Sequence, residues 1–266
     1  MTRLPEDTKG LILDMDGVLW ADSHALIDLP ATFSRFQELN LAVTLATNNG
    51  TRTVEQYLEK LAGFGVTVEP WQVVTSALAV AELLARRFSP GTPIFAIGGE
   101  GVMQALRSKG FTLLSVENAP EAEAVVFGID RAITFQKMVE ATLLVRAGRP
   151  FYATNPDKTF PTPRGQIPGA GAWLSVITTA SGVQPIIAGK PQTPLLEMAL
   201  ERLGTSKEQT WVIGDRLDTD IAGGQALGCR TALVLTGVST RAQAEDWQPS
   251  VDLIGESLWD LVKPDA

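Results

Sequence analysis

The sequence predicts an α/β fold in which a parallel sheet is interrupted, along the chain, by a second αβ domain. Apolar strand-like runs alternate with amphipathic helical stretches in the first and last thirds of the 266 residues, and this alternation is typical of parallel sheets. The middle third carries a complete αβ pattern of its own. We therefore expect a first domain formed by residues 1–80 and 185–266 and an inserted domain formed by residues 81–184.

The first predicted strand, residues 10–13, runs directly into two aspartates, Asp14 and Asp16, before Gly17. Residues two apart in an extended segment point the same way, so we expect both carboxylates in one small space. Two negative charges at that distance raise one pKa, and the pair then needs a cation or a shared proton. An ordinary Asp-Gly turn after a strand is the alternative.

The second predicted strand, residues 42–47, also ends in small polar groups. Thr47 is its last residue, and Asn48 and Asn49 follow at once. In a parallel sheet, ligands gather beyond the carboxyl ends of the strands. The polar groups of both strands are therefore expected at one edge of the sheet.

The middle of the chain contains short strands at residues 94–97, 124–129 and 151–154. A helix is expected after Thr134, which suits an N-cap position. Its apolar positions recur at helical spacing, so we expect this helix to bury one stripe. The stripe consists of Phe135, Met138, Val139, Thr142 and Leu143.

A polar, proline-rich segment, TNPDKTFPTPR at residues 154–164, follows the last of these strands. Such a segment is most often a surface loop, but in an inserted domain it can also face a site on the first domain. Asn155 and Asp157 can hydrogen-bond a polar leaving group, and Phe160 can cover a flat one. These three residues are our candidates for substrate specificity.

The last third returns to the first pattern. A short strand, residues 185–189, delivers Lys190, and a strand at residues 210–213 leads through Gly214 to Asp215. Asp220 can be explained as part of the first turn of the following helix, where a carboxylate is favourable. Asp215 has no such explanation, so the acidic strand ends together indicate a site.

Composition limits the function further. The formal charge of −8 argues against nucleic acid as a partner, and no apolar run is long enough to span a membrane. The first residues lack the apolar core of a signal peptide, so we expect a cytoplasmic protein. The single cysteine, Cys229, and the single histidine, His24, exclude an internal disulfide and a histidine-based zinc site. We expect Cys229 to be buried and His24 to lie at the surface.

Four segments resemble, in order, the four motifs of the haloacid dehalogenase (HAD) superfamily. They are DMDGV at 14–18, TNN at 47–49, GKP at 189–191 and GDRLDTDI at 214–221. The TNNGTR form of the second motif, the insertion and its TNPD are similar to the NagD-like, or 4-nitrophenyl phosphatase-like, branch of subfamily IIA. The resemblance implies a Rossmann-like core, a C2-type cap domain and Mg²⁺-dependent hydrolysis of small-molecule phosphate monoesters.

The resemblance also implies roles for the acidic residues. Asp14 would be the nucleophile that forms an aspartyl-phosphate, and Asp16 the general acid and base. Mg²⁺ would be held by Asp14, the backbone carbonyl of Asp16 and Asp215. Asp220 would lie just behind these ligands.

The remaining motif residues would hold the transferring phosphoryl oxygens. These residues are Thr47, Asn48, Asn49 and Lys190. They would supply the local positive field and hydrogen-bond donors that a chain of net charge −8 lacks overall.

Two other functions remain open at this point. A phosphotransferase or mutase would use the same aspartyl-phosphate, and a non-catalytic binding protein can share the fold. The substrate is open too: relatives act on phosphoglycolate, nucleotides, sugar phosphates or pyridoxal phosphate. Vertebrate pyridoxal phosphatases have a cap histidine, which this insertion lacks. We expect a small phosphate ester as partner, neither nucleic acid nor membrane, with a homo-oligomer left open.

Overall fold

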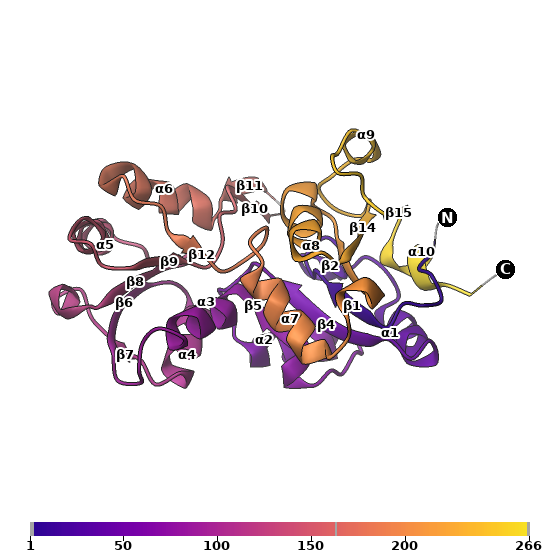
Figure 1. Ribbon diagram of the computed structural model, residues 1–266, viewed down its shortest axis with the longest axis horizontal. Helices are drawn as coiled ribbons and strands as arrows, with labels where there is room; N and C mark the ends of the chain where they lie inside the picture. The colour runs from indigo at the N-terminus through magenta and orange to yellow at the C-terminus, as the bar shows by residue number, and fades with distance from the viewer. Residues whose placement is uncertain (1–2, 163, 265–266) are drawn as a thin grey trace. The chain divides into compact units, whose positions relative to one another are not determined.

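The computed structural model describes residues 3–162 and 164–264 (Figure 1). The chain forms two compact units that alternate along the sequence. The first comprises Met1–Thr47, Glu55–Val74 and Lys190–Ala266, and the second comprises Asn48–Val54 and Thr75–Gly189. The α/β fold with an inserted αβ domain is therefore confirmed. The functional division into a core of residues 1–80 and 185–266 and a cap of residues 81–184 stays a prediction, because compactness does not show which residues cover a substrate.

The first unit is built on a six-stranded sheet whose strand order is β15-β14-β13-β1-β4-β5. In that order the strands are Leu253–Gly255, Arg230–Val234, Thr210–Gly214, Gly10–Leu13, Ala42–Thr47 and Val73–Thr75. β1 pairs in parallel with both β13 and β4, so that Leu13 lies beside Ile213 and Leu45. The carboxyl ends of these three central strands therefore meet at one edge of the sheet.

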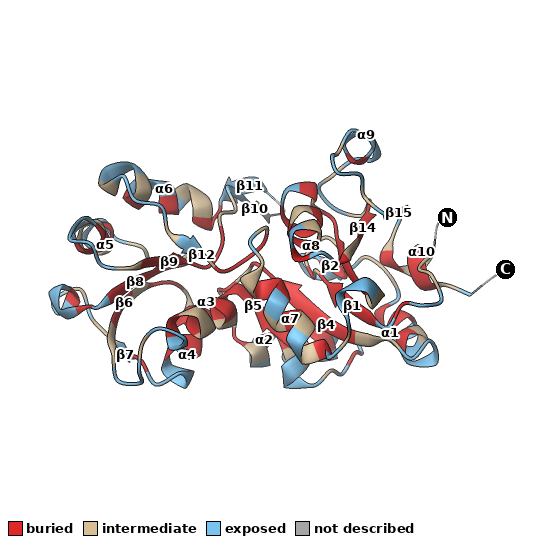
Figure 2. Ribbon diagram, in the orientation of Figure 1, coloured by how far each residue is buried: buried red, intermediate tan, exposed pale blue. Residues whose placement is uncertain are grey.

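Apolar burial explains why β1 lies in the middle of this sheet. All four of its residues are buried, and β4 is buried along most of its length (Figure 2). Strands that are covered on both faces read as continuous apolar runs. The helices of this unit are α1 Leu29–Glu38, α2 Val54–Gly63, α7 Pro194–Leu203, α8 Ala222–Leu227, α9 Arg241–Glu245 and α10 Leu258–Val262. A small hairpin of β2 Trp20–Ala21 and β3 His24–Ala25 follows β1.

The second unit has its own five-stranded sheet, with the order β12-β9-β8-β6-β7 and parallel pairing throughout. In that order the strands are Ile186–Ile187, Phe151–Ala153, Ala124–Phe127, Pro93–Ile97 and Thr112–Leu113. Its helices are α3 Ser76–Ala85, α4 Glu100–Ser108, α5 Phe135–Arg146 and α6 Ala170–Ser181. Phe95, Val125, Phe127 and Ile177 form part of its separate apolar core.

The buried face of α5 differs from the predicted stripe. Thr134 caps the helix as expected, accepting a hydrogen bond from the Lys137 amide. However, Phe135 and Leu143 are 83% and 56% exposed. The face that packs on the sheet core contains Met138, Ala141, Leu144 and Val145. The predicted stripe was right for Met138, which is buried, and wrong for Phe135 and Leu143, because α5 has apolar residues on more than one face.

The proline-rich segment is not simply a loop. Thr159–Thr162 (β10) and Gly165–Pro168 (β11) pair as an antiparallel hairpin, while residue 163 lies outside the described residues. Cys229 is buried as expected, and burial raises the pKa of its thiol to about 11. His24 is exposed. Among the residues that the structure describes, no helix has the length and apolar character needed to cross a membrane.

Candidate active site

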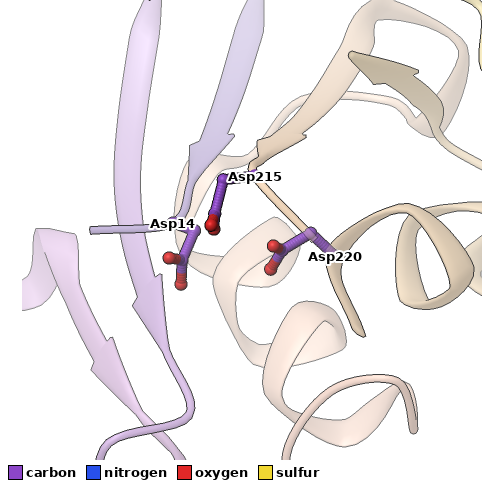
Figure 3. A group of neighbouring side chains, drawn as sticks. All are labelled: Asp14, Asp215 and Asp220. Carbon is purple, nitrogen blue, oxygen red and sulfur yellow. The ribbon is translucent and has the colours of Figure 1, made fainter. Parts of the chain in front are cut away.

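Three carboxylates from separate parts of the first unit converge at the carboxyl edge of its sheet. Asp14 directly follows β1, Asp215 directly follows β13, and Asp220 lies in a π-helical turn, Leu217–Ile221, that leads into α8. One oxygen of each lies within 4.8 Å of the others. Figure 3 shows the three side chains arranged around one small space.

Lys190, the first residue of the segment Lys190–Ala266 of the first unit, contacts this acidic cluster. Its Nζ lies 2.6 Å from Asp14 Oδ1 and 2.6 Å from Asp220 Oδ1, and it donates a third bond of 2.9 Å to the Ala46 carbonyl. The residue is only 2% exposed. Burial alone would lower its pKa, but the two carboxylates outweigh that effect and raise the pKa, so the ammonium stays charged.

The carboxylates carry more negative charge than Lys190 can balance. Burial is the main cause that raises the pKa of Asp14 well above its ordinary value, and the charges of Asp220 and Asp215 add to it, against the opposing effect of Lys190. Burial, with the charge of Asp220, also raises the pKa of Asp215 to about 7. Such a site is more stable with a proton or a cation bound.

The surroundings of Asp215 point to a cation. Its Oδ2 accepts a 2.8 Å hydrogen bond from the Val238 amide, whereas its buried Oδ1 has no hydrogen-bond partner in the described structure. A buried carboxylate oxygen is costly when it is left without a partner. Gly17 and Gly237 pack against this carboxylate so closely that a Cβ at either position would collide with it. Oxygen donors around an unsatisfied buried oxygen fit a hard divalent cation such as Mg²⁺.

Both oxygens of the Asp220 carboxylate have polar partners in the structure, which the sequence did not predict. Its Oδ2 accepts a 3.1 Å bond from the Arg216 amide, while its Oδ1 contacts Lys190. Gly214 lies directly against its carboxyl group, where a larger residue would not fit. The carboxylate therefore closes the turn after β13 and holds Lys190 at the same time.

Asp16 does not join the three carboxylates as its spacing predicted. β1 ends at Leu13, so the strand alternation does not extend through Asp14 to Asp16. The Asp16 carboxylate instead accepts a 2.8 Å hydrogen bond from Nε1 of Trp20. Trp20 is fully buried and stacks on Phe64, with a ring-centroid distance of 5.8 Å. The role of Trp20 was not predicted from the sequence, because this hydrogen bond depends on how the glycine turn brings Trp20 back to Asp16.

The second motif spans the boundary between the two units. Thr47 ends β4 in the first unit and is 2% exposed. Asn48 and Asn49 belong to the second unit. The Asn49 side chain accepts hydrogen bonds from the amide and hydroxyl of Thr51, at 3.1 and 2.7 Å, and so shapes the turn before α2.

Two of the three cap candidates lie beside Asn48 within the second unit. Asp157 accepts hydrogen bonds of 3.1 and 3.3 Å from Asn48 Nδ2, and Asn155 donates one of 2.7 Å to the Asn48 carbonyl. Phe160 lies on β10 and is partly buried. No local sequence signal could have revealed these contacts, because more than a hundred residues separate the partners.

The comparisons with known proteins cover nearly the whole chain. A family model described as haloacid dehalogenase-like hydrolase matches residues 11–112, and a HAD-hydrolase-like model matches residues 187–261. An acid sugar phosphatase of Staphylococcus aureus is 38% identical over 232 residues, which are 87% of this chain and 88% of that protein.

Solved structures agree with these matches. A 4-nitrophenylphosphatase from Thermotoga maritima has a TM-score of 0.90 and 32% identity, covering 97% of this chain and 98% of that one. A glycerol phosphate phosphatase from Mycobacterium tuberculosis, in complex with magnesium, has a TM-score of 0.89 and 32% identity, covering 97% of this chain and 77% of that one.

Proposed function

Because this chain belongs to the haloacid dehalogenase-like hydrolases, we propose that it is a Mg²⁺-dependent phosphatase that hydrolyses small-molecule phosphate monoesters through an aspartyl-phosphate. The observation that carries the proposal is the cluster of Asp14, Asp215 and Asp220, in which Asp14 and Asp220 pair with the ammonium of Lys190 and one buried oxygen of Asp215 is unsatisfied. A nucleophile, a cation site and a fixed positive charge are the parts that phosphoryl transfer requires.

Asp14 acts as the nucleophile. One of its carboxylate oxygens attacks phosphorus, the bond between phosphorus and the ester oxygen breaks, and a phosphoryl group remains on Asp14. The 2.6 Å contact with Lys190 keeps the carboxylate in one orientation for this attack. Water then attacks the same phosphorus, which releases inorganic phosphate and restores the carboxylate.

Asp16 moves the protons. It donates a proton to the departing ester oxygen in the first step and accepts one from the attacking water in the second. The hydrogen bond from Trp20 occupies Oδ1 of Asp16. An indole N–H can only donate, so Oδ1 stays an acceptor and Oδ2 is the oxygen that carries the proton.

Mg²⁺ would be held by Asp14, Asp215 and the backbone carbonyl of Asp16. When bound, the ion neutralises negative charge that develops on the phosphoryl oxygens. Asp220 keeps Lys190 in place through the 2.6 Å ion pair. Each of the three clustered carboxylates thus has its own role: Asp14 is the nucleophile, Asp215 is a metal ligand, and Asp220 holds Lys190.

The phosphoryl oxygens are bound by residues of the second and third motifs. We assign this role to Thr47, Asn48, Asn49 and Lys190. Donors that are fixed before the reaction stabilise the spread negative charge of the transition state without having to reorganise. All esters present the same phosphoryl group, so these residues act on every substrate alike.

The relatives named above act on sugar phosphates, glycerol phosphate and 4-nitrophenyl phosphate. Sugar and polyol phosphates are accordingly our first candidates for the natural substrate. Among the cap residues, Phe160 remains our candidate for reading the leaving group. The neighbouring Asn155 and Asp157 were assigned to the same role from the sequence, and their contacts with Asn48 favour a different one.

A panel of phosphate esters assayed with Mg²⁺ tests the proposal. We expect release of inorganic phosphate, no turnover in excess chelator, recovery when Mg²⁺ is added, and no turnover by a folded Asp14→Asn variant. A phosphotransferase would instead pass the phosphoryl group to an added sugar and leave water unused. Unchanged activity in Asp14→Asn would contradict the nucleophile assignment.

A further inference from the structure

Two of the four residues that follow β9, Asn155 and Asp157, bind Asn48 inside the second unit. The Asn48 carbonyl accepts a 2.7 Å hydrogen bond from Asn155 Nδ2 and another of 2.5 Å from the hydroxyl of Ser76. The Asn48 side chain donates to the carboxylate of Asp157. Asn48 is thus held through both its main chain and its side chain.

The bonds to the Asn48 carbonyl are buried, and those from its side chain to Asp157 are partly buried. The Asp157 amide donates a 3.2 Å bond to Asn155 Oδ1, which locks the two residues of the segment together. Asn48, Asn155 and Ser76 are 8%, 4% and 0% exposed. Buried polar groups that satisfy one another in this way fix a single arrangement, since each broken bond would leave a partner unsatisfied.

The same segment also binds the residue at the other end of the second unit. The Gly189 amide donates a 2.7 Å bond to the Thr154 carbonyl. A Cβ at Gly189 would lie 2.5 Å from both Asn48 Oδ1 and the Thr154 carbonyl oxygen, so only glycine fits there. Asn48 directly follows Thr47 in the chain, and Gly189 directly precedes Lys190. The segment Thr154–Asp157 therefore binds Asn48, to which we assign phosphate binding, and also binds Gly189. The other residues with that assignment, Thr47, Asn49 and Lys190, are chain neighbours of these two.

We propose that Asn155 and Asp157 are positioning residues that orient Asn48 for phosphate binding, and that they do not read the leaving group. This inference rests on the proposed phosphatase function. With its carbonyl and its side chain both fixed, Asn48 can present its main-chain N–H in only one direction. The carboxylate of Asp157 gives a charge-assisted hydrogen bond, which is the stronger kind.

Inorganic phosphate is the decisive probe because it has no leaving group. We expect Asp157→Ala to raise the inhibition constant of inorganic phosphate by about 10-fold, the order of effect of one lost charge-assisted hydrogen bond. The kcat/KM values of all esters should fall by comparable factors. Asp157→Asn should retain most of both properties, because its amide oxygen still accepts from Asn48 Nδ2.

Two further variants separate the outcomes. Thr159→Val, at an exposed position of β10, is the matched control and should change neither measurement. Ser76→Ala removes the second bond to the Asn48 carbonyl with almost no change of volume. It should weaken phosphate inhibition in the same direction even if Asp157→Ala folds poorly.

Two results together would overturn the inference: unchanged inhibition by inorganic phosphate in Asp157→Ala, and a changed order of kcat/KM values among the esters. They would show that Asp157 recognises the leaving group. Failure of the proposed function looks different. In that case the wild-type enzyme would hydrolyse no ester with Mg²⁺ and would not bind inorganic phosphate.

Discussion

At the scale of single residues, Lys190 is the group on which the acidic cluster depends. Its buried ammonium pairs with Asp14 and Asp220 at the same time. Removing one partner from a buried ion pair leaves an uncompensated charge, which typically costs about 3–5 kcal/mol. The lysine therefore stabilises the fold, in addition to the phosphate binding that we propose for it, and the sequence motif alone suggested only the proposed role.

The hydrogen bond from Trp20 to Asp16 leads to a prediction about proton transfer. Trp20→Phe keeps the buried ring but removes the N–H that orients Asp16. Proton donation by Asp16 matters most for alkyl esters, whose alkoxide is a strong base, and least for 4-nitrophenyl phosphate. We expect kcat/KM for glycerol phosphate to fall about 10-fold more than kcat/KM for 4-nitrophenyl phosphate, a part of the ~10²–10⁴ that a general acid contributes.

The control for Trp20→Phe is Phe64→Leu, which disturbs the same ring stack and leaves the N–H in place. It should lower both kcat/KM values equally, if at all. Equal losses for both esters in Trp20→Phe would show that the indole only fills space.

At the level of helices and strands, the central strands and the residues at their carboxyl ends could be predicted from the sequence. β1 and β4 were predictable because continuous apolar runs indicate strands that are covered on both faces, and Asp14 and Thr47 follow from where those runs end. The position of the Asp16 carboxylate was not predictable, because it depends on how the glycine turn brings Trp20 back. The buried face of α5 depended on its tertiary neighbours, which periodicity does not contain.

The glycine turn after β1 gives an element-scale prediction. Gly17 has a φ of +89°, and a Cβ there would lie 2.5 Å from Asp215 Oδ2. Gly17→Ala should therefore lower the melting temperature and abolish the stabilisation by Mg²⁺. The matched control is Gly204→Ala, which has a similar φ of +68° but no atom near the added Cβ.

Both alanines pay the left-handed backbone cost of about 1–2 kcal/mol. Only Gly17→Ala also displaces the Asp215 carboxylate. Equal losses of thermal stability and equal responses to Mg²⁺ in the two variants would mean that the contact with Asp215 is unimportant.

At the level of the whole molecule, two αβ units share one chain, and the second and third motifs, at 47–49 and 189–191, lie where the chain passes from one unit to the other. The Rossmann-like parallel core with an inserted C2-type cap, which the motif resemblance implied, is confirmed by the fold and its structural relatives. The motif order was enough to predict this division because all four motifs flank the insertion. Contacts such as Asn48 with Asp157 depend on the folded insertion and could not be predicted.

The charge of the assembled site gives a pH prediction. Folding raises the pKa of Asp215 to about 7 from its ordinary value of 3.8, chiefly by burial. A group whose pKa is raised on folding stabilises the folded protein below its unfolded pKa, and this contribution is lost as pH rises through the folded value. The metal-free protein should therefore lose thermal stability as pH rises from about pH 4 to about pH 7, with little further change above about pH 8.

Mg²⁺ competes with the proton for the same carboxylates, so the rise in melting temperature on adding Mg²⁺ should be larger at about pH 8 than at about pH 6. Differential scanning calorimetry with and without the ion measures both quantities. In Asp215→Asn, which cannot ionise, the pH dependence should be weaker and the response to Mg²⁺ should disappear. A response to Mg²⁺ that is the same at both pH values would contradict the assignment.

We propose that Asp14 carries the phosphoryl group during turnover, and this can be tested directly. Borohydride added to the working enzyme reduces an aspartyl-phosphate to homoserine, which peptide mass spectrometry can locate in the sequence. With a turning-over ester and Mg²⁺, we predict homoserine at position 14 and at no other aspartate, and none when substrate is omitted. Steady release of inorganic phosphate with Asp14 unmodified under these conditions would contradict the account.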